Sequence, residues 1–271
     1  MKGLKFKPLV LCLAVTPVAA VAEIQMLDDS EMGAVTGQAG VSIELETKVN
    51  IDEFRYIDEG MLAISDIEIG GTNRTDLFPE FRTNLTSHPA SDLIDNIRID
   101  IDVLADGDAV INVQPVPILG AVDLRVSTGE WQLRGTTDST TILDNFHMDA
   151  LLGSATIRVD TQTDYLNFRT DIAIDDLEFD APFIAVGIRD LRLTGDEYDI
   201  DEKRVLDLFA TVELDMYRGH RADGRDALAI DLQEFRSDIT IGGVLVGETS
   251  IGSVALDDLV ITDTAMRVYG H

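Results

Sequence analysis

The chain of 271 residues is poor in cysteine, in aromatic residues and in positive charge. Its single cysteine, Cys12, cannot form an intramolecular disulfide, so burial of apolar side chains must hold the fold together. Aromatic residues make up 6% of the chain, and 21 lysine and arginine residues face 50 aspartate and glutamate residues. The formal net charge of −29 argues against nucleic acid and anionic lipid surfaces as partners, because both are polyanionic.

Residues 1–22 have the features of a Sec signal peptide. Three lysines precede an apolar stretch that is shorter than the ~20 residues of a membrane helix. Ala20-Val21-Ala22 then provides an A-x-A cleavage site before Glu23. Cleavage would remove Cys12 and the three lysines, leaving 18 of the 21 basic residues against 50 acidic ones, a net charge of −32. We therefore expect an exported protein, with no integral membrane segment after cleavage.

Apolar and polar residues alternate along most of the chain, and this period of two is typical of half-buried β-strands. At six places the alternation slips by one residue, because two polar residues separate two apolar ones, and the second of these polar residues is Asp or Asn. Residues 51–56 are a near copy with Glu53 in that position. An extra residue in a strand predicts a β-bulge, where Asp and Asn tolerate unusual backbone angles. This slipped motif occurs at 64–69, 94–99, 143–148, 172–179, 188–193 and 256–261.

No window shows a sustained period of 3.6 residues, so we expect little helix. The pattern predicts an all-β fold in which long, bulged antiparallel strands form a curved sheet or a sandwich. Residues 1–22 would be the cleaved signal, residues 23–40 an N-terminal turn or short helix, and residues 41–271 a single β-rich domain. A parallel β-helix is the alternative, although motif spacings of 14 to 68 residues do not match one coil length.

The sequence contains no recognisable catalytic motif, so no enzymatic activity is expected. None of the four histidines has metal-ligand spacing, and neither a nucleophile elbow nor a phosphate-binding glycine loop is present. His147 alternates outward and is expected to be a solvated strand residue. The acidic stretch 196–202 is the one place where carboxylates crowd together, as calcium ligands do. The calcium candidates are Asp196, Asp199, Asp201 and Glu202, with a solvated acidic loop as the alternative; no other cofactor is expected.

Three stretches carry a resemblance to a known family: LDDSEMGAVTGQAGVSIELE, FRYIDEGMLAISDIEI and SIGSVALDDLVITDTAMRVYGH. Together with the signal peptide, they resemble the FilA-like pilus assembly proteins, a family of exported Gram-negative proteins. The resemblance implies a role in the cell envelope or at the cell surface, linked to filaments. It supplies no catalytic residues.

These observations favour an exported, acidic structural or interaction protein of the cell envelope or surface. We expect it to bind protein partners in the envelope or in a surface filament through strand edges, using residues 41–51 or 254–268. Its location would be the periplasm, the outer membrane or the cell surface. The alternative is a periplasmic carrier of a lipid or another apolar ligand, held on a continuous apolar face of the sheet.

Overall fold

The computed structural model describes residues 40–81, 85–86, 89–116 and 120–270. Two compact units are distinguished, residues 1–37 and residues 38–271. The expected signal peptide and all but Gly40 of the expected N-terminal segment lie outside the described residues.

All described strands belong to one 13-stranded sheet, and every strand pair in it is antiparallel. The all-β expectation is confirmed, whereas the parallel β-helix alternative is wrong. The strands are β1 (Val41–Thr47), β2 (Val49–Ile57), β3 (Met61–Gly70), β4 (Ile94–Val103), β5 (Ala109–Pro115), β6 (Val122–Thr128), β7 (Trp131–Arg134), β8 (Ser139–Asp160), β9 (Tyr165–Ala181), β10 (Val186–Thr194), β11 (Ala210–His220), β12 (Asp226–Val246) and β13 (Thr249–Val268). Short 3₁₀ turns occur at η1 (Pro79–Phe81), η2 (Pro182–Ile184) and η3 (Val205–Leu208).

The thirteen strands line up end to end into eight rows. Four rows consist of two or three strands in line: β1 with β2, β4 with β3, β5 with β6 and β7, and β11 with β10. The other four rows are the single long strands β8, β9, β12 and β13. Most neighbouring rows also follow one another along the chain, so the sheet is a meander, as the short turns between strand patterns predict.

Five of the six slipped motifs contain a residue with positive φ in the Asp or Asn position. These residues are Asp66, Asn96, Asn145, Asp190 and Asp258, with φ between 49° and 58°. The sixth motif, at Asp176, lies where the β8–β9 register shifts, and its φ is not positive. Because the bulge adds one residue, Ile174 and Leu177 pair with Ala150 and Met148 and so share one face. The bulges therefore keep apolar residues on the same face instead of passing them to another sheet.

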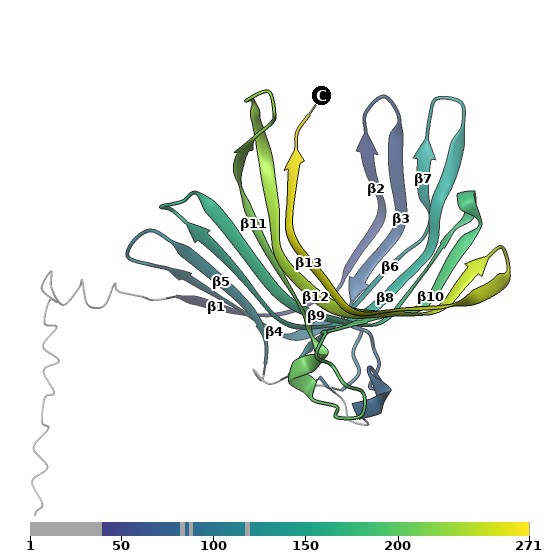
Figure 1. Cartoon of the computed structure of the whole chain (residues 1–271), viewed down its shortest axis with the longest axis horizontal. Helices are drawn as coiled ribbons and strands as arrows, with labels where there is room; N and C mark the ends of the chain where they lie inside the picture. The colour runs from purple at the N-terminus through teal and green to yellow at the C-terminus, as the bar shows by residue number, and fades with distance from the viewer. Residues whose placement is uncertain (1–39, 82–84, 87–88, 117–119, 271) are drawn as a thin grey trace, which may run out of the picture. The chain divides into compact units, whose positions relative to one another are not determined.

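Three rows are interrupted by excursions that leave the sheet on the same side (Figure 1). Their described residues are 71–81, 85–86 and 89–93 in the first, 116 and 120–121 in the second, and 195–209 in the third. Their apolar side chains pack on the sheet in one small cluster, formed by Leu77, Phe78, Ala121, Leu151, Ala173 and Leu208. We call the sheet face that carries Leu151 and Ala173 the outer face, and the opposite face the inner face.

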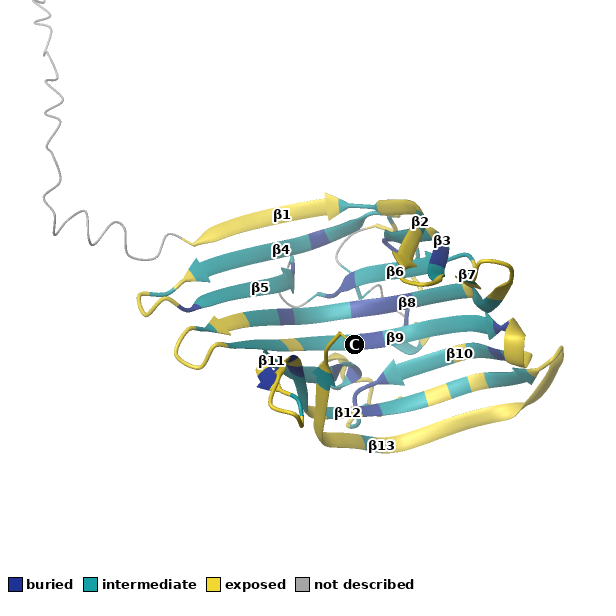
Figure 2. Ribbon diagram, turned by 90° about the horizontal axis from the view of Figure 1, so that it is seen from above, coloured by how far each residue is buried: buried dark blue, intermediate teal, exposed yellow. Residues whose placement is uncertain are grey.

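The strands bend away from the excursions toward both ends, so the inner face is concave (Figure 1). Burial is concentrated in the middle of the central strands, while β1, β2 and β13 are exposed along almost their whole length (Figure 2). The sequence predicts aliphatic side chains that seal an interior and acidic ones that face water. The observed sheet is curved but does not form a sandwich, and its inner face has no second layer among the described residues.

Candidate functional site

The inner face is predominantly apolar, with Thr170 as the one polar member of a line of residues that crosses it. One line of directly paired residues crosses the sheet from edge to edge as Ile43, Ile99, Val113, Ala155, Thr170, Val212, Phe235 and Ile261. The next line, one residue away, points to the outer face and is polar throughout: Ser42, Asp100, Asn112, Thr156, Arg169, Glu213, Glu234 and Thr262. The alternation in the sequence is therefore a division between two chemically different surfaces.

Many large apolar side chains of the inner face are open to solvent. Their exposed fractions range from 37% at Ile261 to 68% at Val103. The exposed apolar residues that the pairing places on this face are Val41, Ile43, Leu45, Val49, Ile51, Phe54, Tyr56, Val103, Leu133, Val159, Leu228, Val246, Val254, Leu256, Ile261, Met266 and Val268. Monomeric soluble proteins rarely expose contiguous apolar patches larger than a few hundred Å², and large exposed patches mark interaction sites.

Charge on the inner face is confined to one strand tip. In the described strand pairs, the acidic, basic and histidine residues that share this face are Arg218, His220 and Asp226, at the tip of the β11–β12 hairpin. A hollow of about 660 Å³ lies beside this tip. Its lining includes Arg218, Arg225, Leu228 and Val268. The apolar surface thus ends in a polar region at this corner.

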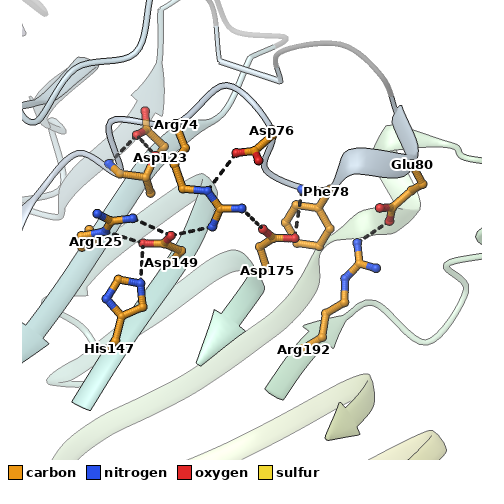
Figure 3. A network of polar contacts seen from close by, with 11 residues as sticks. Arg74, Asp76, Phe78, Glu80, Asp123, Arg125, His147, Asp149, Asp175 and Arg192 are labelled. Atoms are coloured by element: carbon orange, nitrogen blue, oxygen red, sulfur yellow. Dashed lines mark hydrogen bonds and ion pairs between the residues drawn. The ribbon is translucent and has the colours of Figure 1, made fainter. Parts of the chain in front are cut away.

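The outer face carries a buried ionic cluster under the excursions (Figure 3). Asp149 is fully buried and accepts hydrogen bonds from Arg125 Nε at 2.7 Å and from Arg74 Nη1 at 2.7 Å. His147 Nε2 lies 3.4 Å from the same carboxylate. Arg74 also lies 3.4 Å from Asp175, which in turn accepts the backbone N–H of Phe78 at 2.9 Å. The cluster therefore ties the first excursion to β8 and β9.

The pKa values of these carboxyls move in opposite directions. Burial alone would raise the pKa of Asp149, but hydrogen bonds from His147, Arg125 and Arg74 outweigh it and lower that pKa below its usual range. Burial raises the pKa of Asp175 despite the bond from Phe78. Burial also raises the pKa of Asp176, helped by the negative charges of Glu178 and Asp190. Since every charge in the Asp149 cluster is paired, its geometry indicates a structural role.

The calcium candidates from the sequence lie in the third excursion. Asp199 Oδ1 accepts the backbone N–H of Asp201 at 2.7 Å, and Asp196 pairs with Arg236 at 3.6 Å. In the described part of the chain, the one group of three acidic residues close enough to share a cation is a different one. It consists of Asp176, Glu178 and Asp190, whose carboxylate oxygens lie within 4.8 Å of one another.

Sequence reasoning missed the ionic cluster. His147 alternates onto the outer face as expected, but its imidazole lies against the buried Asp149 instead of being surrounded by water. Arg74 lies 75 residues before Asp149 in an irregular segment, so no local pattern links the two. The only local signal is Asp149 itself, an acid between Met148 and Ala150 at the centre of a long apolar strand.

A family model described as a family of unknown function, DUF6160, matches residues 1–105. No curated protein and no solved structure matches the chain. Among the described residues, no helix has both the length and the apolar character needed to cross a membrane.

Proposed function

We propose that this is an exported, non-catalytic protein of the cell envelope that holds the acyl chains of a lipid on its inner face. The observation that carries the proposal is the line of paired residues that crosses all eight rows with an apolar side chain at every position except Thr170, while the neighbouring line is polar throughout. An acyl chain offers no hydrogen-bonding groups, so it suits a surface built from aliphatic side chains.

The size and chemistry of the inner face fit this occupant. Eight rows spaced ~4.8 Å apart give a surface about 35–40 Å across the strands, long enough for an extended acyl chain. The polar head of a lipid could remain at the β11–β12 tip, where Arg218, His220 and Asp226 interrupt the apolar surface. The acidic outer face would keep the loaded protein in water.

Binding of an uncharged acyl ligand tests the proposal. We expect the processed chain to bind N-phenyl-1-naphthylamine with increased fluorescence, and monopalmitoyl glycerol to displace the probe. The double variant Val159→Asp, Leu228→Asp places charge on two inner-face positions that are 41% and 48% exposed, so the fold should tolerate it. Losing contacts worth about 1.5–3 kcal/mol should weaken binding roughly tenfold or more.

Leu206→Asp is the matched control, because Leu206 is 83% exposed and lies in the third excursion, outside the inner face. It should bind the acyl glycerol as tightly as the parent. Equal binding by the parent and the double variant would contradict the proposal. So would the absence of acyl ligands in native mass spectra of protein taken from the periplasm.

A second candidate function is binding to another protein through the sheet edges. The observation that favours it is the exposure of both outermost rows, β1 with β2 and β13, over almost their whole length. Deleting residues 41–51 should then abolish crosslinking to an envelope or filament partner in intact cells while the remainder stays soluble. Crosslinking that survives the deletion would exclude that edge.

A further inference from the structure

The two edge rows of the sheet are similar in length and accessibility. The β1–β2 row spans Val41–Ile57 and the opposite edge, β13, spans Thr249–Val268. In the described sheet, each of these rows is paired on one side only, β1 and β2 with β4 and β3, and β13 with β12. Their outward N–H and C=O groups are therefore available to another strand.

The number of rows fixes how the edges can meet. Eight antiparallel rows is an even number, so the β1–β2 row and β13 run in opposite directions. A second copy in the same orientation, placed with its β1–β2 row beside β13, therefore continues the antiparallel order. With an odd number of rows, the same placement would give a parallel pair.

The faces of the two edges also match. Val41 and Ile43 on one edge and Ile261 and Met266 on the other all belong to the inner face. The line along which the excursions interrupt the rows, which we call the bend, reaches one edge at Lys48, between β1 and β2, and the other at Asp258 in β13, whose N–H donates to Asp238 opposite Thr194. Lys48 already pairs within its own chain, with Glu68 at 3.1 Å and with Asp92 at 3.2 Å, so the register between copies follows from aligning the bends and not from an ion pair.

We propose that copies of this chain assemble head to tail, with the β1–β2 row of one copy paired antiparallel to β13 of the next. This inference rests on the strand-edge function proposed above and names its partner, a second copy. In such an assembly the inner faces join into one apolar surface that continues from copy to copy. The contact is heterologous, so it produces a closed ring or an open filament.

Single-cysteine variants test the assembly directly, because Cys12 in the expected signal is the only cysteine of the chain. Ile43→Cys lies on one edge and Thr264→Cys on the other, at matching distances from the bend. After mild oxidation, a mixture of the two variants should form a disulfide-linked dimer, and neither variant alone should. The double variant should give a ladder of higher oligomers.

Three results would overturn the proposal. Equally strong dimers from Ile43→Cys alone or from Thr264→Cys alone would show that like edges meet. Absence of crosslinking in the mixture at high protein concentration would show that the edges do not meet. Equal crosslinking of Ile43→Cys with Leu256→Cys, which lies on the other side of the bend, would show contact without register.

The acyl-glycerol displacement assay, run on the same variants, separates the proposed assembly from the proposed lipid-binding function. Binding of monopalmitoyl glycerol without crosslinking would reject the assembly and leave the lipid-binding function standing. Crosslinking without binding of monopalmitoyl glycerol would reject the lipid-binding function and leave the assembly standing.

Discussion

At the scale of single residues, the fold depends on Asp and Asn at positions where the backbone has a positive φ, a conformation that most residues avoid. Positive φ costs an ordinary L-residue roughly 1–2 kcal/mol, and Asp and Asn lower that cost by bonding to nearby backbone groups. Asn145 has a φ of 53°, and its side-chain amide donates to the carboxylate of Asp180, on the neighbouring row, at 3.1 Å.

Replacing Asn145 separates the backbone effect from the hydrogen bond. Asn145→Gly loses the bond to Asp180 but accepts the positive φ, whereas Asn145→Val loses both. We expect the valine variant to be less stable than the glycine variant by about 1–2 kcal/mol in urea unfolding. Equal stabilities would mean that the positive φ is not a constraint.

The sequence predicts these residues well because a bulge is a local event. Two polar residues between two apolar ones, ending in Asp or Asn, are visible within four positions. The Arg74–Asp149 contact is not visible in this way, because it joins segments 75 residues apart. Its partners are set by the path of the first excursion, which the alternation does not encode.

At the scale of elements, the excursions supply the main buried cluster of the molecule. Phe78 is completely buried between the first excursion and the sheet, and the guanidinium of Arg192 lies 4.6 Å from its ring centroid. The first excursion lies outside the alternating stretches of the sequence, so the period of two predicts no strand there. The segment does contain the turn η1, but its leucine and phenylalanine side chains have no periodicity that predicts burial.

Phe78→Ala measures how much this packing contributes. Removing a fully buried phenylalanine side chain should lower the free energy of unfolding by about 3–5 kcal/mol. Phe183→Ala is the control, because Phe183 is 58% exposed in the turn between β9 and β10, and its loss should cost under about 1 kcal/mol. Urea unfolding of both variants makes the comparison, and similar losses would show that the excursions do not anchor the sheet.

At the scale of the whole molecule, the raised and lowered carboxyl pKa values predict a stability maximum in mildly acidic solution. Burial raises the pKa of Asp175, Asp176 and Asp238 in the folded state, so their charged forms destabilise the fold at neutral pH. As the pH falls through these raised pKa values, the folded state takes up protons first and stability rises.

Further acidification reverses the trend. The pKa of Asp149 is lowered in the folded state, so its stabilisation is complete above the ordinary carboxyl pKa of about 3.9 and is lost as the pH falls below it. Thermal unfolding measured between about pH 3 and about pH 8 should therefore show a maximum. Asp176→Asn should reduce the rise in stability on mild acidification. A stability that only decreases as the pH is lowered would contradict the raised pKa values of Asp175, Asp176 and Asp238.

The sequence also predicts which residues share a face, but not whether that face is covered. Alternation places Ile43 and Ile261 on the apolar side equally well in a sandwich or in an open sheet. The inner face would be covered only by a second layer of structure. In the described chain, the excursions pack on the outer face instead. This is why the expected sealed interior is absent while the expected strands are present.

The succession of rows along the chain has a consequence for folding kinetics. Two of the longest antiparallel contacts, β8 with β9 and β12 with β13, are hairpins closed by short turns, so each can form before distant segments meet. Low sequence separation between partners lowers the entropy that must be lost before native contacts form. Refolding should therefore begin at these two hairpins, before β1 joins its distant partner β4.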